Sequence, residues 1–350
     1  MSMMIRLKRG FAVVLLLPAA AAWLLVGASG ASGRDADKPA AAADVLAGVR
    51  TFFRKTARDD GSFRPGTDPA HEGISDSAYS DLAPVTYAVI LHKTFGWKLP
   101  HELKTREFLR SRQRKDGAFY NVGGTVDPES AQGRVYNTTQ GLVALHALGL
   151  RPRYDPLPVF ALVLKADYRQ LPAYSTSFFP LAYQANGQRL PPAPDRKLRA
   201  TMTQADDGYL NDHIAATFHA VHYYRLLGEK TPKSEAILRR TLRDQKPDGS
   251  WLLNPPARDR HATFDAVFVL RQLGSDRPAC RRAIARAAAW ALRCRNADGG
   301  FGHFPGSVSD ADAVYFQVGT LVMAGVLRPV KLPRADARLL GWGHVFPLPQ

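Results

Sequence analysis

A short turn signal recurs five times along the chain, and this repeat constrains the fold more than any other feature. Its glycines are separated by 56, 91, 41 and 50 residues. Repeats of roughly 20 to 50 residues are typical of architectures built from one supersecondary unit. The interval of 91 residues predicts two units, one of which has lost its Asp-Gly pair and lies within residues 156–187. The five copies are DDGSF (59–63), KDGAF (115–119), DDGYL (206–210, with Tyr209 as its aromatic residue), PDGSW (247–251) and ADGGF (297–301).

The segments on either side of each turn have helical periodicity of two kinds. Before the turns, ELKTREFLRSRQ (102–113) and EAILRRTLRDQ (235–245) carry apolar side chains on one face and basic ones on the other. After the turns, TTQGLVALHALG (138–149) and FQVGTLVMAG (316–325) are apolar on most sides. Six such pairs, each with a solvated and a buried helix, predict an all-α (α/α)6 toroid over residues 44–330. A toroid of this kind encloses a central cavity.

The N-terminal residues resemble an export signal. A basic segment, MSMMIRLKRG, precedes the apolar run FAVVLLLPAAAAWLLVGA (11–28) and a tail of small residues. This run is also long enough for a retained membrane anchor. We therefore expect a signal peptide or anchor over residues 1–33, a linker over 34–43, and a body that is periplasmic, secreted or tethered outside the cytoplasm. Residues 331–350 are expected to form an extended C-terminal tail.

The charge indicates which kind of surface the protein contacts, and the cysteine positions indicate whether a disulfide can form. The formal net charge is +16, but Lys and Arg are scattered without interleaved aromatic residues. This pattern favours contact with an anionic membrane surface over nucleic-acid binding. Cys280 and Cys294 fall in one predicted helix, where a rise of about 1.5 Å per residue puts them roughly 20 Å apart. They should be free thiols, because a disulfide spans only a few ångströms.

The repeat resembles that of a known superfamily. PDGSW and ADGGFGHFPG are similar to the repeats of terpenoid cyclases of the squalene-hopene cyclase type and of protein prenyltransferase β subunits. The resemblance covers roughly residues 44–330 and implies the alpha-alpha toroid. It also implies that the glycine turns and their aromatic residues tie outer helices to inner ones.

The chain departs from the prenyltransferase pattern at the zinc ligands. The resemblance places an Asp-x-Cys pair at the start of one inner helix and a His in the last repeat, where this chain has Ala262, Phe264 and Ala313. Zinc activates the thiolate in prenyl transfer, so the loss disfavours protein prenylation, and we expect no metal and no cofactor. Two alternatives stay open for His261 and Asp265. They could form a different metal site together with His213 or Asp312, or they could simply be a hydrogen-bonded pair on one helix face.

The cyclase branch of the superfamily points to carboxylates. Asp310-Ala-Asp312-Ala resembles the Asp-x-Asp-Asp motif at the head of an inner helix, whose middle Asp protonates an alkene. This resemblance makes Asp312 the candidate general acid, with Asp310 and Asp265 as further candidate catalytic carboxylates. The last Asp of the motif is replaced by alanine. Asp310 or Asp312 could instead simply cap the following helix.

These observations predict a toroid without the family's zinc site that binds an apolar or isoprenoid-like ligand, or a peptide, in its cavity. One alternative is an active terpenoid or lipid cyclase or transferase that uses Asp312 as acid. Another is an exported glycan-acting enzyme with Asp265 and Asp312 as paired carboxylates. The candidate ligand-binding residues are cavity aromatics and groups near the expected mouth, where Arg side chains suit diphosphate: His213, Tyr136, Tyr174, Arg258, Arg260, His261, Phe264 and Tyr315.

Overall fold

The structure, a computed structural model, describes residues 37–166, 171, 175–256 and 260–330. The predicted signal or anchor segment (1–33) and the tail (331–350) lie outside these residues. The linker predicted over 34–43 needs correction, since the helix α1 (Asp37–Thr56) begins within it. The alanines of the sequence DKPAAAAD favour a helix there, because alanine has the highest intrinsic helix propensity.

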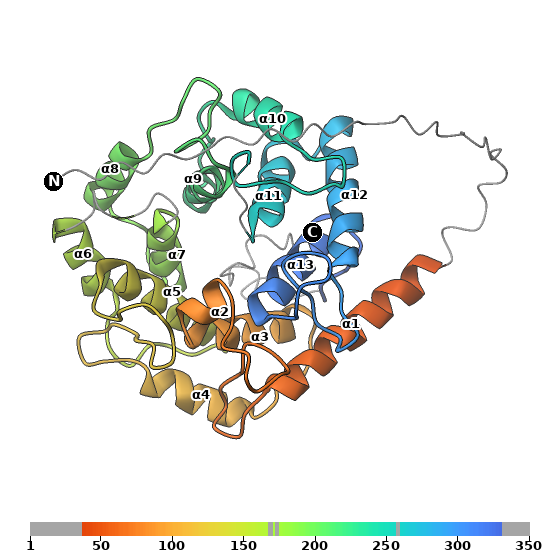
Figure 1. Ribbon diagram of the computed structural model, residues 1–350. Coiled ribbons are helices and arrows are strands. Elements are labelled where there is room, and N and C mark those ends of the chain that lie inside the picture. The colour runs from red at the N-terminus through yellow and green to blue at the C-terminus, as the bar shows by residue number, and fades with distance from the viewer. Residues whose placement is uncertain (1–36, 167–170, 172–174, 257–259, 331–350) are drawn as a thin grey trace, which may run out of the picture. The chain divides into compact units, whose positions relative to one another are not determined.

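Six inner helices form a closed ring, which Figure 1 shows end-on. Each inner helix contacts the next one along the chain, and the last returns to the first. All 13 residues of the last inner helix are buried, as expected for a helix surrounded on every side. The ring confirms the predicted all-α toroid. The inner helices are α3 (Leu82–Thr94), α5 (Ala131–Ala147), α7 (Phe178–Ala185), α9 (Ile214–Leu227), α11 (Ala262–Gly274) and α13 (Ala311–Met323).

Six outer helices alternate with the inner ones in sequence. The helix of residues Ser234–Arg243 buries four side chains and turns its other residues to solvent, as its one-sided pattern predicts. The third hairpin falls within residues 156–187, where the sequence predicts a unit without an Asp-Gly turn. The outer helices are α1, α4 (Glu102–Ser111), α6 (Leu157–Ala166), α8 (Pro192–Thr201), α10 (Ser234–Arg243) and α12 (Pro278–Arg293), and a short helix, α2 (Asp76–Tyr79), precedes α3.

Each Asp-Gly turn joins the outer and inner helices of its own hairpin and packs against the outer helix or loop of the next hairpin. In the PDGSW turn, Oδ1 of Asp248 accepts a hydrogen bond from the backbone N–H of Ser250 (3.0 Å), and Gly249 has a φ of 95°. A Cβ at Gly249 would lie 2.4 Å from the carbonyl oxygen of Arg286 in α12. Glycine is therefore required by both its conformation and its neighbour. The turn of the last hairpin makes the same kind of contact with the first, because a Cβ at Gly299 would lie 2.4 Å from the carbonyl oxygen of Gly48 in α1.

In three of the five turns, the residue that ends the turn also forms a hydrogen bond with its own inner helix. The backbone N–H of Phe119 donates to Oγ1 of Thr138 (3.1 Å), and that of Trp251 donates to Oγ1 of Thr263 (3.2 Å). In the third copy, which belongs to the fourth hairpin, Leu210 and not Tyr209 takes this place, and its N–H donates to Oγ1 of Thr217 (3.1 Å). The hydroxyl of Tyr209 is instead within hydrogen-bond distance (2.9 Å) of Thr241 in α10. The turns thus have the structural role that the resemblance implies.

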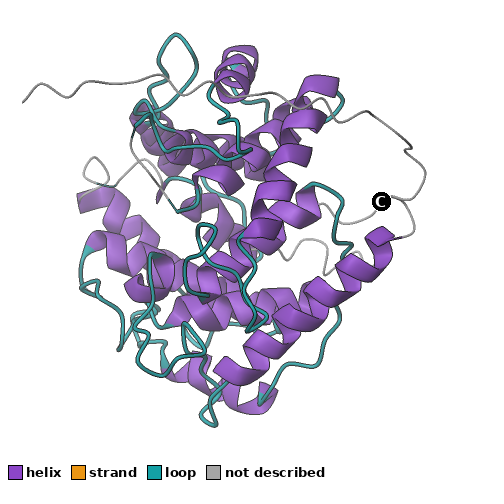
Figure 2. Ribbon diagram, turned by 45° about the vertical axis from the view of Figure 1, so that its right-hand side comes forward, coloured by secondary structure: helices purple, strands orange, loops and turns teal. Residues whose placement is uncertain are grey.

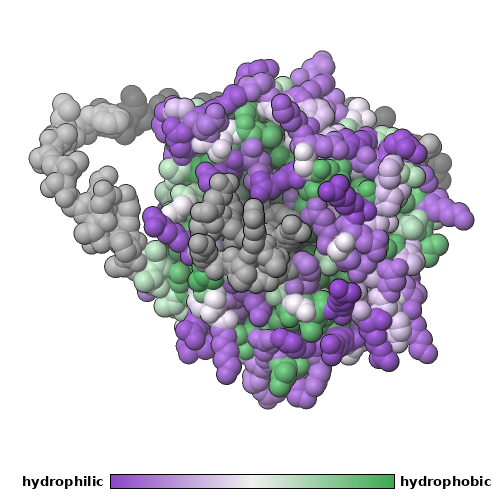
Figure 3. Space-filling view, turned by 180° about the vertical axis from the view of Figure 1, so that it is seen from behind, coloured by the Kyte–Doolittle hydropathy of each residue, from purple (hydrophilic) through white to green (hydrophobic). Residues whose placement is uncertain are grey.

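The remaining features of the fold agree with a helical protein held together by packing. Figure 2 draws helices and loops over the described residues, with no strand. Cys280 and Cys294 are both buried free thiols, as predicted. None of the helices in the described part of the chain is long and apolar enough to cross a membrane. On the face opposite Figure 1, hydrophilic side chains occupy most of the described surface, with smaller hydrophobic areas between them (Figure 3).

Candidate functional site

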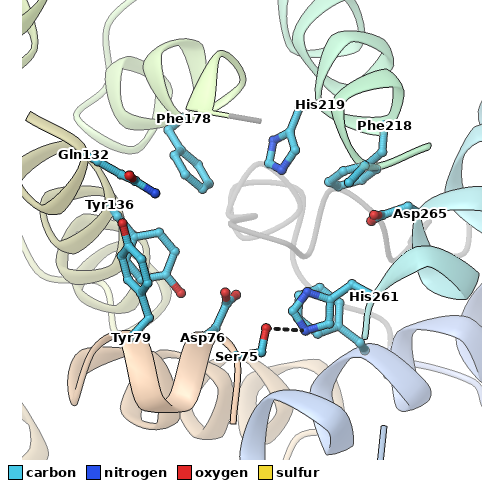
Figure 4. A pocket seen from close by; sticks show the side chains of 12 residues that line it. Ser75, Asp76, Tyr79, Gln132, Tyr136, Phe178, Phe218, His219, His261 and Asp265 are labelled. Atoms are coloured by element: carbon cyan, nitrogen blue, oxygen red, sulfur yellow. Dashed lines mark hydrogen bonds between the residues drawn. The ribbon is translucent and has the colours of Figure 1, made fainter. Parts of the chain in front are cut away.

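A cavity of about 250 Å³ lies at the centre of the ring. Five inner helices and the short helix α2 contribute to its wall, so residues far apart in sequence face one another across it (Figure 4). Aromatic rings form much of the wall. Of its polar groups, Ser75, Asp76 and His261 lie near α2 and the start of α11, whereas Gln132 and His219 lie beside Phe178. The lining residues are Ser75, Asp76, Tyr79, Gln132, Tyr136, Phe178, Ala215, Phe218, His219, His261, Asp265 and Phe316.

The polar side of the cavity begins at the turn before α2. Ser75 has a φ of 58° and a ψ of −126°, a conformation that is strained for a residue with a side chain. It leads into Asp76, whose Oδ2 accepts a hydrogen bond from the hydroxyl of Tyr87 (2.6 Å). Burial raises the pKa of the Asp76 carboxyl above its usual value. This carboxyl lies on the cavity wall itself.

Asp310 lies next to the cavity wall and caps α13. Its Oδ1 accepts a hydrogen bond from the backbone N–H of Asp312 (3.1 Å), as the capping interpretation predicts. Its Oδ2 accepts from the N–H of Ile74 (2.9 Å) and lies 2.8 Å from Nε2 of His71. Burial and the neighbouring charge of Asp312 raise the pKa of Asp310 to about 8. Asp310 therefore joins the end of the last hairpin to the loop before α2.

Asp312 is wholly buried and lies among two histidines and the turn before α2. Its Oδ1 is 2.8 Å from Nε2 of His303, and its Oδ2 is 3.5 Å from Nε2 of His261. Oδ2 also accepts a hydrogen bond from the backbone N–H of Asp76 (2.9 Å). Burial by itself would raise the pKa of Asp312, but the charge of His303 and the close polar contacts with Asp310, His261 and His303 hold it well below the usual value.

Of the predicted catalytic residues, Asp310 and Asp312 lie together at the start of α13 and Asp265 lies in α11, and only Asp265 reaches the cavity. Asp265 lies on the cavity wall, while Asp310 and Asp312 are absent from it. Both of the latter are fully buried. Asp312 has Ser77, Asp76 and His261 as neighbours on the side of α2 and α11.

The predicted ligand-binding residues divide into four groups. Tyr136 and His261 lie on the cavity wall. His213 caps α9, where its Nδ1 accepts a hydrogen bond from the N–H of Ala216 (3.1 Å). The other described members pack in the core or face solvent: Phe264 is edge-on to Phe316, Tyr315 is stacked on Tyr87 with ring centroids 4.4 Å apart, and Arg260 is exposed. Tyr174 and Arg258 lie outside the described residues.

Two residues that the sequence interpretation did not select are central to the site, namely Asp76 and His303. His303 follows the Gly-Gly-Phe turn and is 2% exposed. Asp76 lies in a short helix that carries no repeat signal. His219, which the sequence interpretation did not select either, also lines the cavity, and its Nδ1 is 2.7 Å from Oγ of Ser177. Burial lowers the pKa of His219 to about 3.

The structure allows a test of the zinc site that the resemblance implies. Ala262 and Ala313 carry no atom that binds a metal, and Phe264 has only a ring. The family's own ligand positions therefore do not fit zinc. Beside them, however, one ligand atom each of His261, His303 and Asp312 lie within 4.8 Å of one another. Two imidazoles and a carboxylate are a ligand set that suits zinc.

The model of the prenyltransferase alpha-alpha toroid domain matches residues 20–157 and 168–342. A search of curated proteins found no match.

Solved structures with the same ring are distant in sequence. A type II terpene cyclase from Scytonema, in complex with its substrate geranylgeranyl dihydroxybenzoate, is 15% identical, with a TM-score of 0.56 over 87% of this chain and 100% of that one. The Candida albicans protein geranylgeranyltransferase-I, complexed with GGPP, is 10% identical, with a TM-score of 0.54 over 76% of this chain and 94% of that one. A protein from Actinoplanes is 16% identical, with a TM-score of 0.51 over 81% and 99%. Likeness at this level establishes the fold alone.

Proposed function

Because this chain belongs to the family of prenyltransferase alpha-alpha toroid domains, we propose that it binds an apolar, isoprenoid-like ligand in the cavity at the centre of the ring. The observation that carries this proposal is the aromatic wall, to which Tyr79, Tyr136, Phe178, Phe218 and Phe316 contribute. Apolar, mostly preformed cavities with a few polar groups are typical of small-molecule sites. A cavity of about 250 Å³ suits a short isoprenoid better than a folded peptide segment.

The arrangement of polar groups gives the ligand an orientation. Ser75, Asp76 and His261 lie together on one side of the cavity, while Phe178 and Phe218 lie on the other (Figure 4). A ligand with one polar end would place that end near Asp76 and its hydrocarbon against the phenylalanines. No Lys or Arg is found among the described residues of the wall, so we favour a neutral polar end, such as a hydroxyl, over a diphosphate.

The two structural neighbours with isoprenoid compounds support this ligand class. Each has the same ring fold and binds a geranylgeranyl compound. The support is general, since the identities are low. The ligands of these neighbours agree with the aromatic wall, but they do not distinguish a protein that only binds its ligand from an enzyme that converts it.

We favour binding over the alternatives of acid catalysis and glycan cleavage by Asp312. A general acid must come within hydrogen-bond distance of the atom that it protonates. Asp312 is 0% exposed and is not part of the cavity wall. The paired-carboxylate mechanism fails for the same reason, because it needs both Asp265 and Asp312 at one cleft.

We further propose that the protein acts outside the cytoplasm, close to an anionic membrane surface. The basic and apolar character of residues 1–33 and the net charge of +16 support this location. A membrane would also supply apolar ligands of the proposed kind.

The cavity proposal is tested with Ala215, a half-buried residue of α9 on the cavity wall. Ala215→Phe should place a ring in the cavity and reduce binding of a dansyl-labelled geraniol at least tenfold, measured by fluorescence titration in the presence of EDTA. The matched control is Ala289→Phe on the exposed side of α12, which should bind as the wild type does. Equal binding by all three proteins, or no binding by the folded wild type, would refute the cavity as the site.

A further inference from the structure

We propose that His261, His303 and Asp312 form a binding site for one divalent transition-metal ion, with Zn²⁺ as the preferred ion, at the edge of the cavity. The site uses none of the positions at which the superfamily resemblance implies zinc ligands. It shares His261 with the wall of the proposed isoprenoid cavity, but His303 and Asp312 are not part of that wall.

The three residues bring one ligand atom each within 4.8 Å of one another, and two of the donor distances are near those that a metal requires. Zinc bonds to His nitrogen and carboxylate oxygen are about 2.0–2.2 Å, so two donors of a tetrahedral site lie roughly 3.4 Å apart. Nε2 of His261 lies 3.5 Å from Oδ2 of Asp312, and Nε2 of His303 lies 2.8 Å from Oδ1. A shift of a few tenths of an ångström at His303 would bring the second distance to the expected value. The carboxylate between the two imidazoles offers one oxygen to each side.

The geometry of two buried polar atoms in the same place also favours a cation site. Nε2 of His303 and Oδ1 of Asp312 form an ion pair at 2.8 Å, but they make no well-directed hydrogen bond with each other or with any other described group. Both side chains are almost fully buried. A buried polar atom without a partner is costly, by about 1–3 kcal/mol in general. One cation placed between these two atoms would satisfy both.

The residues around the three ligands hold them in position. The backbone N–H of Asp312 donates to Asp310 and its Oδ2 accepts from the N–H of Asp76. The loop that carries His303 is fixed on one side by the hydrogen bond from the N–H of Gly302 to the carbonyl of Cys294 (2.8 Å). On the other side, the N–H of Phe304 donates to Oγ of Ser307 (3.0 Å). Such outer contacts orient metal ligands and increase affinity.

The site would be open toward the cavity. His303 and Asp312 are buried behind the wall, but His261 lies on it. Oγ of Ser75 is 3.5 Å from Nε2 of His261, so this hydroxyl or a water molecule from the cavity could fill a fourth position. Zinc sites with three protein ligands and one open position are typical of zinc that acts on a ligand, whereas structural sites are closed. The strained backbone of Ser75 agrees with a functional position.

The proposal is tested by measuring metal binding directly. The full-length protein is stripped with EDTA, exchanged into metal-free buffer and titrated with Zn²⁺ against a competing chelator of known affinity. We expect one equivalent per chain. His261→Gln and His303→Gln should each weaken the affinity at least about 100-fold, more than the 10–100-fold expected from the loss of an outer contact. With Co²⁺ the wild type should show visible absorption of a four- or five-coordinate site without a thiolate band.

The matched control is His101→Asn, which removes an exposed histidine at the start of α4 and keeps a residue that tolerates its φ of 49°. This variant should bind as the wild type does. Circular dichroism of each variant shows whether it is folded. The proposal is overturned if the folded wild type binds no zinc, or if the His261 variant, whose side chain is 15% exposed and whose loss should be tolerated by the fold, binds it equally well. Because the geraniol titration is done in EDTA, either proposal can fail without the other.

Discussion

Replacing Gly249 by alanine should destabilise the ring more than the same change at a glycine of similar conformation elsewhere. Gly249 has a φ of 95° and lies against α12, where an added Cβ would be 2.4 Å from the carbonyl oxygen of Arg286. Gly306 has a φ of 83°, and an added Cβ would meet no atom within 4 Å. The pair therefore separates the backbone cost from the cost of pushing two hairpins apart.

The expected magnitudes follow from these contacts. A left-handed conformation costs an alanine about 1–2 kcal/mol relative to glycine, and this is the whole effect expected for Gly306→Ala. At Gly249 the new methyl group also overlaps a helix backbone. Overpacking of this kind costs a further amount of about 1–3 kcal/mol. We expect Gly249→Ala to lower the free energy of unfolding by roughly 2–5 kcal/mol in total.

Urea unfolding followed by circular dichroism measures both variants against the wild type, with the slope of the transition as a check that the unfolded states are comparable. If Gly249→Ala and Gly306→Ala lose the same stability, the contact between the turn and α12 does not contribute, and the argument that these turns lock neighbouring hairpins is wrong.

Two further predictions concern pH and location. Burial lowers the pKa of His92 to about 4; since the unfolded chain binds its proton near pH 6.5, this histidine should cost stability as the pH falls from 6.5 to 4, by at most about 3 kcal/mol. Urea unfolding at pH 7 and 4.5 should show a smaller pH effect in His92→Gln and an unchanged one in the exposed-site control His101→Asn. For location, a C-terminal fusion of the full chain to a phosphatase that is active only after export should be active, and deletion of residues 1–33 should abolish that activity; equal activity of both fusions would contradict the export proposal.

The ring could be predicted from the sequence because its determinants are local. An Asp that accepts a hydrogen bond from the N–H two residues later, followed by a glycine at positive φ, is a chemical signal within five residues. The third turn, DDGYL, shows the limit of that signal, since the pattern does not tell whether Tyr209 or Leu210 takes the inner position. The hydrogen bond from Leu210 to Thr217 decides it.

The site could be predicted only in part because it depends on ring closure. Asp76 and Asp312 are 236 residues apart and meet through one hydrogen bond, and no periodicity connects them. The inner helices are apolar on all sides, so the sequence does not show which aromatic residues face the cavity. Tyr136 does, whereas Tyr315 turns toward Tyr87. A buried His in a glycine loop, such as His303, becomes significant only when its neighbours are known.

The contact of Gly299 with α1 has a consequence for how the molecule is made. Until the sixth hairpin leaves the ribosome, the first five can form only an open arc. The surface of α1 against which the ADGGF turn packs remains uncovered until then. The salt bridge between Arg295 and Asp44 joins the same two ends. The Asp310 and Asp312 contacts with the loop before α2 form in that final step as well. A chain that lacks its last sixty residues, and with them Arg295, Gly299, Asp310 and Asp312, would therefore have neither the closing contacts nor the site.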